Sequence, residues 1–171
     1  MIDRKKIWLP DRKKLRLEWY DYNKSWHYFV TLWIKKRKEI FWEIKNREII
    51  LNEYGKIAYK LWKGISNHIP LILINEFIIM PDHIHWILII KNIPCPGRKS
   101  ATPSKNILSK AIHWFKSSFT REIRKRNDEF NFSWQRSFFD RIIKNKKHFD
   151  ETKKYIKNNP KNRKRRKLNE F

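Results

Sequence analysis

Two histidines separated by one residue are the first side chains in this sequence whose types and spacing suggest chemistry. His83 and His85 stand at the head of an apolar run that ends at residue 90. Because the side chains of a strand alternate between its faces, a strand here would place both imidazoles on one face and Ile84 on the other. Neutral imidazole is the commonest metal ligand in proteins, so the pair is a candidate metal site. The alternative is a solvated strand edge with no chemical role.

A second candidate group lies near the end of the chain. Tyr155 and Asn159 are four residues apart, which places them on the same face of a helix. A phenol is a poor nucleophile at its usual pKa of about 10, but beside a cation that polarises a phosphate it can form a phosphotyrosine link. The carbonyl oxygen of Asn159 could complete the coordination begun by His83 and His85. The alternatives are a tyrosine at the edge of the core and a helix cap before Pro160.

Strands and helices alternate along the part of the chain that must position these residues. β-Branched and aromatic runs predict strands at residues 26–34, 71–79, 83–91 and 138–143. Residues 40–50 form a less regular extended segment or a hairpin around Lys45 and Asn46. Apolar residues three and four positions apart predict helices at residues 51–67, 105–125 and 145–158. We expect Pro160 to end the last helix.

The length of 171 residues predicts one domain with a sizeable core. The loop at residues 92–104, which holds three prolines and a glycine, is too short to separate two domains. We divide the chain into a basic arm (residues 1–18), a single domain (residues 19–160) and a basic flexible tail (residues 161–171). The tail cannot fold alone, and we expect it to be mobile or to order on a polyanion.

The net charge of +24, from 41 Lys+Arg against 17 Asp+Glu, calls for a polyanionic partner. Nucleic acid is the first candidate because neutralised phosphates release counterions. An anionic membrane surface is second, although no apolar stretch is long enough to span a bilayer. The cations that we expect to contact phosphate, each of which could instead belong to a solvated face, are Arg12, Lys13, Arg16, Lys110, Lys116, Arg121, Arg124, Arg136, Arg163 and Arg165.

The cellular compartment is indicated by two features that the sequence lacks, a second cysteine and a signal-peptide pattern. Cys95 is the only cysteine and cannot form an internal disulfide, which suits a reducing environment. The N-terminal residues lead into no long apolar stretch and so show no signal-peptide pattern. We therefore expect a cytoplasmic protein that binds nucleic acid.

The sequence resembles the single-tyrosine transposases with an HUH motif, of the insertion-sequence-200 type, and within them the REP-associated tyrosine transposases. The resemblance covers roughly residues 15–160. The most distinctive segments are Met80-Pro81-Asp82-His83-Ile84-His85 and Tyr155-Ile156 followed by Asn159-Pro160. The further matching segments, all in order, are Tyr20-Asp21-Tyr22, residues 28–31, residues 51–55, Phe115-Lys116 with Thr120, Trp134-Gln135 and residues 138–143.

This resemblance implies an α+β, ferredoxin-like fold with a central antiparallel sheet and packed helices. It implies that His83 and His85 bind Mg²⁺ or Mn²⁺, with Asn159 as a third ligand. Tyr155 would cleave single-stranded DNA beside a hairpin, forming a 5′-phosphotyrosine and freeing a 3′-hydroxyl. The expected partners are single-stranded DNA and DNA hairpins. The working form is a monomer or a homodimer, in which Tyr155 could complete the partner's histidine pair.

The sequence departs from the family pattern at Asp82, where asparagine is commoner, and after Pro160, where a basic tail replaces the usual apolar continuation. Two alternatives to a strand-transferring enzyme stay open. One is a basic protein that binds DNA or RNA hairpins without cleaving them. The other is a metal-dependent nuclease in which water attacks in place of Tyr155.

Overall fold

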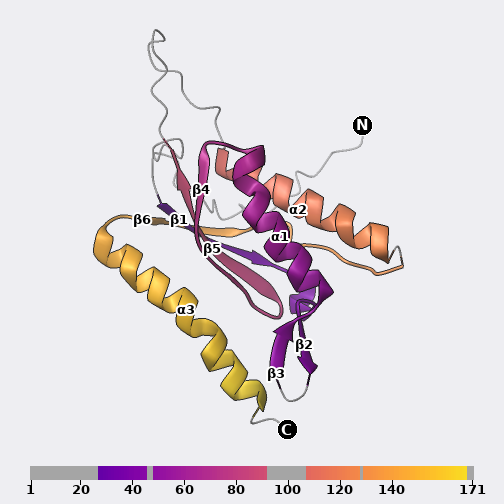
Figure 1. Cartoon of the computed structure of the whole chain (residues 1–171). Helices are drawn as coiled ribbons and strands as arrows, with labels where there is room; N and C mark the ends of the chain where they lie inside the picture. The colour runs from indigo at the N-terminus through magenta and orange to yellow at the C-terminus, as the bar shows by residue number, and fades with distance from the viewer. Residues whose placement is uncertain (1–26, 46–47, 92–106, 128, 169–171) are drawn as a thin grey trace, which may run out of the picture.

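A four-stranded antiparallel sheet forms the centre of the computed structural model, which describes residues 27–45, 48–91, 107–127 and 129–168 (Figure 1). Its strands are β1 (His27–Trp33), β4 (Ile72–Ile79), β5 (His83–Ile90) and β6 (Phe139–Ile143), in the spatial order β4-β5-β1-β6. The two central strands, β1 and β5, are therefore paired on both sides.

The connectivity of this sheet is that of a ferredoxin-like fold. Helix α1 (Glu53–His68) leads from β1 to β4, a tight turn joins β4 to β5, and helix α2 (Ile107–Arg126) precedes β6. This is the β-α-β-β-α-β order with all neighbouring strands antiparallel. The expected fold class is confirmed.

A small hairpin interrupts the path from β1 to α1. Strands β2 (Trp42–Lys45) and β3 (Glu48–Leu51) pair with each other and not with the main sheet. Asn52 then caps α1, because its Oδ1 accepts a hydrogen bond from the backbone N–H of Gly55 at 3.0 Å. A Cβ at Gly55 would lie 2.5 Å from the carbonyl oxygen of Phe41, so the hairpin can approach α1 this closely only at a glycine.

The main core lies between the sheet and the helix pair α1 and α2. On α1 the buried residues recur at helical spacing, and Trp62 stacks on Phe77 of β4 with ring centroids 4.7 Å apart. On α2 the ring of Phe115 contacts Trp86 of β5 at 4.8 Å. Even-numbered residues of β1 and β5, such as Tyr28 and Trp86, are fully buried on this face. Burial of these large side chains is the main source of stability.

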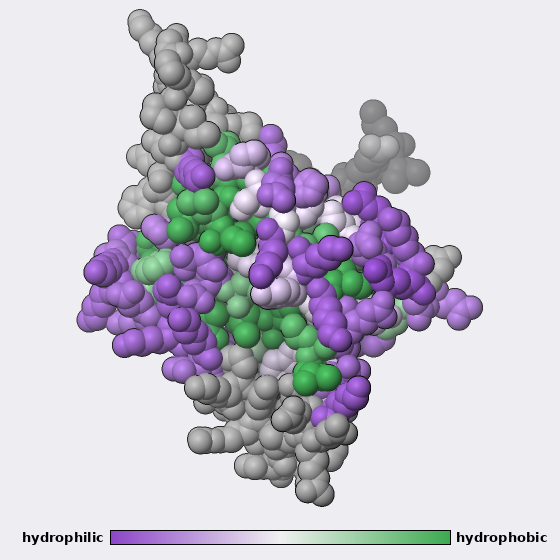
Figure 2. Space-filling model, viewed as in Figure 1, coloured by the Kyte–Doolittle hydropathy of each residue, from purple (hydrophilic) through white to green (hydrophobic). Residues whose placement is uncertain are grey.

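Helix α3 (Lys146–Leu168) packs on the opposite face of the sheet (Figure 1). It contacts a separate and much smaller cluster of buried residues, formed by Ile87, Ile143 and Ile156 with partly buried aromatic and aliphatic neighbours. Hydrophilic residues lie on both sides of the view in Figure 2, and hydrophobic ones gather between them. Among the described residues, no helix is long and apolar enough to cross a membrane.

Most of the predicted elements are confirmed, with ends that differ by a few residues, and residues 40–50 do form most of a hairpin. The predicted end of the last helix is wrong, because α3 continues through Pro160 to Leu168. Proline costs about 3 kcal/mol inside a helix, but the residues that follow are mainly Lys, Arg and Leu, which favour helix and extend it. The arm at residues 1–18 and the loop at residues 92–104 lie outside the described residues. The division into arm, domain and tail stays a prediction.

Candidate active site

His83 and His85 lie side by side on the face of the sheet that α3 covers. In the sheet register His85 is opposite Thr31 of β1 on one side and Ile78 of β4 on the other. Ile84, between the two histidines, is fully buried in the core of the other face. The two Nε2 atoms are 2.9 Å apart. The strand therefore presents the two ring nitrogens to one point, as the spacing predicts.

The other nitrogen of each ring is held by an oxygen. His83 Nδ1 lies 2.6 Å from the Asp82 carboxylate, which can only accept, so Nδ1–H is the donor. His85 Nδ1 lies 2.9 Å from the hydroxyl of Thr31, which is able to accept as well. With both Nδ1 atoms donating, two Nε2 lone pairs face each other and repel. A cation between them removes this repulsion, and oxygen partners on the far nitrogen are typical of histidine metal ligands.

The surroundings favour neutral His85. Burial and, less strongly, the neighbouring His83 lower its pKa to about 3, although Asp82 acts in the opposite direction. For Asp82, burial alone would raise the pKa, but the hydrogen bond from His83 and the nearby Arg37 leave it below its ordinary value. The site thus combines an uncharged imidazole with a carboxylate that stays ionised.

Aromatic side chains of β1 contact both rings of the histidine pair. Phe29 stacks on His85 with ring centroids 5.2 Å apart, and Trp33 contacts His83 at 4.0 Å. The guanidinium of Arg37 lies 3.0 Å from the centre of the Trp33 ring and 3.7 Å from the carboxylate of Asp82. Arg37 has a φ of 55°, in the left-handed region that a non-glycine residue seldom adopts. This backbone strain is typical of functional sites.

Helix α3 brings Tyr155 to the histidines. Its hydroxyl oxygen is 3.5 Å from His85 Nε2, and its ring meets Phe29 edge-on at 6.0 Å. The side chain is 51% exposed, so an incoming group can reach the hydroxyl. Asn159 is partly buried one turn later on the same helix. Within the described ranges, no three or more His, Cys, Asp and Glu side chains lie together in a group that could hold a metal ion.

Two ion pairs tie α3 to the sheet on either side of Tyr155. Lys153 and Lys157, two residues before and after it, lie 3.0 and 3.6 Å from Oε1 of Glu76 on β4. Ile156, between them in sequence, is buried in the cluster below the helix. The ion pairs and the buried isoleucine together set the position of Tyr155 over the sheet.

Three of the cations expected to contact phosphate, Lys116, Arg121 and Arg124, line one pocket along α2. Lys110, Arg121 and Arg124 are exposed on α2, and Arg136 is exposed in the segment before β6. Lys116 is partly buried and donates hydrogen bonds to the backbone carbonyls of Gln135 and Ser137, so it has a structural role. Nothing is described for the side chains of Arg163 and Arg165, and the remaining residues, Arg12, Lys13 and Arg16, lie outside the described ranges.

A family model described as "Transposase IS200 like" matches residues 24–159, most of the chain, including the histidine pair and Tyr155. The chain belongs to the IS200-like transposase family. An uncharacterized protein of Haemophilus influenzae is 32% identical to it over 159 residues, which cover 87% of this chain and 88% of that protein.

The structure of this family member also resembles a solved one, that of a REP-associated tyrosine transposase bound to a REP hairpin. The two share 19% sequence identity with a TM-score of 0.59, over 86% of this chain and 74% of the other. At this identity the likeness is one of fold.

Sequence reasoning about this IS200-like transposase missed the residues that support the site. Thr31, Phe29 and Trp33 lie on β1, and their closeness to His83 and His85 depends on the pairing of β1 with β5, which no local pattern reveals. Asp82 had a usable signal, because it directly precedes His83. Glu76 had none, since its role depends on where α3 docks.

Proposed function

We propose that this protein is a metal-dependent enzyme that nicks and joins single-stranded DNA next to hairpins, with Tyr155 as the nucleophile. One observation carries the proposal. The hydroxyl of Tyr155 lies 3.5 Å from His85 Nε2, at the point where the two histidine rings converge. A phenol, a pair of imidazoles held by oxygens, and a strongly basic chain are the parts that phosphodiester transfer to tyrosine requires.

In this proposal His83 and His85 hold Mg²⁺ or Mn²⁺, and the amide oxygen of Asn159 is the third protein ligand. The bound cation would polarise the scissile phosphate. The oxygen of Tyr155 attacks the phosphorus, a Tyr–O–P bond forms, and the bond to the 3′-oxygen breaks. The phenol proton leaves through solvent and the 3′-oxygen takes up a proton. The product is a 5′-phosphotyrosine and a free 3′-hydroxyl, and attack by a 3′-hydroxyl reverses the step.

The hairpin part of the proposal is supported by the partner named for the related structure, a REP hairpin. The net charge of +24 provides the attraction to phosphate, and the exposed cations of α2 are candidates for the duplex stem. A DNA substrate also agrees with the cytoplasmic location that the sequence predicts. A hairpin-binding protein without cleavage is the second candidate, because the charge alone would support it.

The test uses a labelled synthetic hairpin with unpaired bases on both sides, drawn from the DNA next to the chain's own gene. The protein is incubated with it in Mn²⁺ or EDTA and run on a denaturing gel. We expect a covalent adduct that needs Mn²⁺, is absent for Tyr155→Phe and for the double variant His83→Ala/His85→Ala, and persists for the control Tyr59→Phe on α1.

Each other outcome has a definite meaning. Cleavage without an adduct that survives Tyr155→Phe would make water the nucleophile. Hairpin binding with neither cleavage nor adduct, across hairpins from the same genome, would leave the binding protein as the function.

A further inference from the structure

Strand β6 carries an exposed aromatic ring in the same transverse row of the sheet as the histidine pair. The register places Phe139 opposite Thr31 of β1, and Thr31 opposite His85 of β5. Residues on matching positions of neighbouring antiparallel strands share a face. Phe139 and His85 are therefore on the same face, separated by two strand spacings, or about 10 Å.

The next row of the sheet adds a cation and a link to Tyr155. Arg141 is opposite Phe29, whose ring contacts both His85 and Tyr155. The guanidinium of Arg141 lies 5.9 Å from the centre of the Phe139 ring. Phe139 and Arg141 thus form one exposed aromatic and cationic pair that borders the proposed active site.

Helix α3 covers only one end of β6. Ile143 at that end is buried against Ile156 of α3, whereas Phe139 at the other end is 44% exposed. Its neighbour Phe138 packs against the main core. Of these two adjacent phenylalanines, Phe138 is therefore the packing residue. A single exposed apolar residue is ordinary. What distinguishes Phe139 is its place in the row of His85 and the arginine beside it.

We propose that Phe139 and Arg141 form a stacking subsite for an unpaired base of single-stranded DNA, one or two nucleotides from the phosphate at Tyr155. The inference rests on the proposed function and adds to it where the strand runs, across β1 toward β6. An aromatic face stacks on any base and is worth about 1–3 kcal/mol per base, and arginine beside it can pair with the phosphate. The row geometry aligns such a base with the reaction centre.

The test measures binding of the full chain carrying Tyr155→Phe, so that the DNA stays intact. The probe is the hairpin of the adduct assay, in a series with an abasic site at each unpaired position in turn. We expect Phe139→Ala to weaken binding about fivefold to a hundredfold. At one unpaired position the abasic site should weaken binding by the parent but not by the Phe139→Ala variant, which is the coupling expected of direct contact.

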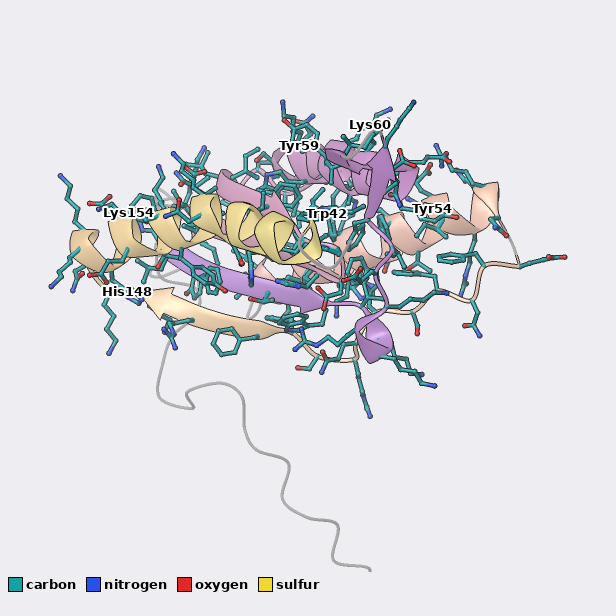
Figure 3. All side chains as sticks on the ribbon, turned by 90° about the horizontal axis from the view of Figure 1, so that it is seen from below. Trp42, Tyr54, Tyr59, Lys60, His148 and Lys154 are labelled. Carbon is teal, nitrogen blue, oxygen red and sulfur yellow. The ribbon has the colours of Figure 1, made fainter. Side chains whose placement is uncertain are left out.

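A matched control is available on the other side of the molecule. Tyr59 of α1 is also 44% exposed and also carries a cation over its ring, that of Lys63 at 4.9 Å. In Figure 3 Tyr59 lies at the top of the view, away from β6 at the bottom. Tyr59→Ala should leave binding unchanged, and Phe139→Trp should preserve it. Arg141→Gln should reduce the slope of affinity against salt by about one.

The inference is overturned if Phe139→Ala shows no coupling to any unpaired position. It is overturned equally if Phe139→Ala lowers the melting temperature by several degrees, because the ring would then be a packing residue. Failure of the proposed function looks different, since the wild-type chain would then form no adduct in Mn²⁺. An adduct without coupling removes only the stacking subsite.

Discussion

Tyr155 lies against His85 of its own chain, with the hydroxyl oxygen 3.5 Å from Nε2. The arrangement joins a helix near the end of the sequence to a central strand, 70 residues apart. One folded chain thus holds the proposed nucleophile and the proposed metal ligands together. We therefore predict that the site is assembled within one chain.

The first prediction follows from this relationship. A mixture of Tyr155→Phe with the double variant His83→Ala/His85→Ala should form no covalent adduct, because neither chain has a complete site. The measurement is the denaturing-gel assay with Mn²⁺ on the mixed proteins. Recovery of about a quarter to a half of the wild-type adduct would instead show that α3 acts on the partner's histidines.

The second prediction concerns Glu76, which we assign as a positioning residue. Glu76→Gln removes the charge that holds Lys153 and Lys157, and the rate of adduct formation should fall about two- to fivefold. Single-turnover rates at saturating DNA would measure this at an unchanged melting temperature. The exposed Glu151→Gln on α3 is the control. The charge reversal Glu76→Lys with Lys153→Glu should restore part of the rate, and a purely structural role would leave it low.

The third prediction concerns Thr31. Thr31→Val keeps the shape and the β-branched side chain but removes the hydroxyl 2.9 Å from His85 Nδ1. Loss of a partner of this kind usually weakens metal binding about 10–100-fold, and we expect that range for Mn²⁺ measured by titration calorimetry. Thr120→Val serves as the control, because that hydroxyl donates to the Lys116 carbonyl on α2. Equal Mn²⁺ affinity for both variants would count against the metal site.

The fourth prediction concerns pH and Lys116. Burial lowers the pKa of its amine from 10.5 to about 8 in the folded state. The unfolded chain therefore binds more protons here between about pH 8 and 10.5, and this residue's contribution to stability rises with pH across that window. The difference in unfolding free energy between wild type and Lys116→Met should shift in favour of wild type over the same window. A flat difference in urea titrations would contradict the burial of this amine.

Local patterns were enough to predict the strands, the helices and the side-by-side histidines. The reason is that the periodicity of a strand or helix depends only on residues that are close together in the sequence. The family resemblance supplied the ferredoxin-like order of the sheet. The supports of the site could not be predicted, since Thr31 reaches His85 and Glu76 reaches Lys153 only through strand register and helix docking. The continuation of α3 past Pro160 was missed because proline is a strong local signal for a helix end.

The unequal covering of the two sheet faces has a consequence for motion. The face under α1 and α2 holds nearly all the large buried side chains, whereas α3 rests on three buried isoleucines and their partly buried neighbours. Segments with few buried apolar contacts open separately, at a lower free energy than the whole molecule. In native-state hydrogen exchange, the amides of α3 should therefore exchange as a group well before those of β1 and β5. The element that carries Tyr155 would then be the first cooperative unit to detach, while the strand that carries His83 and His85 stays folded.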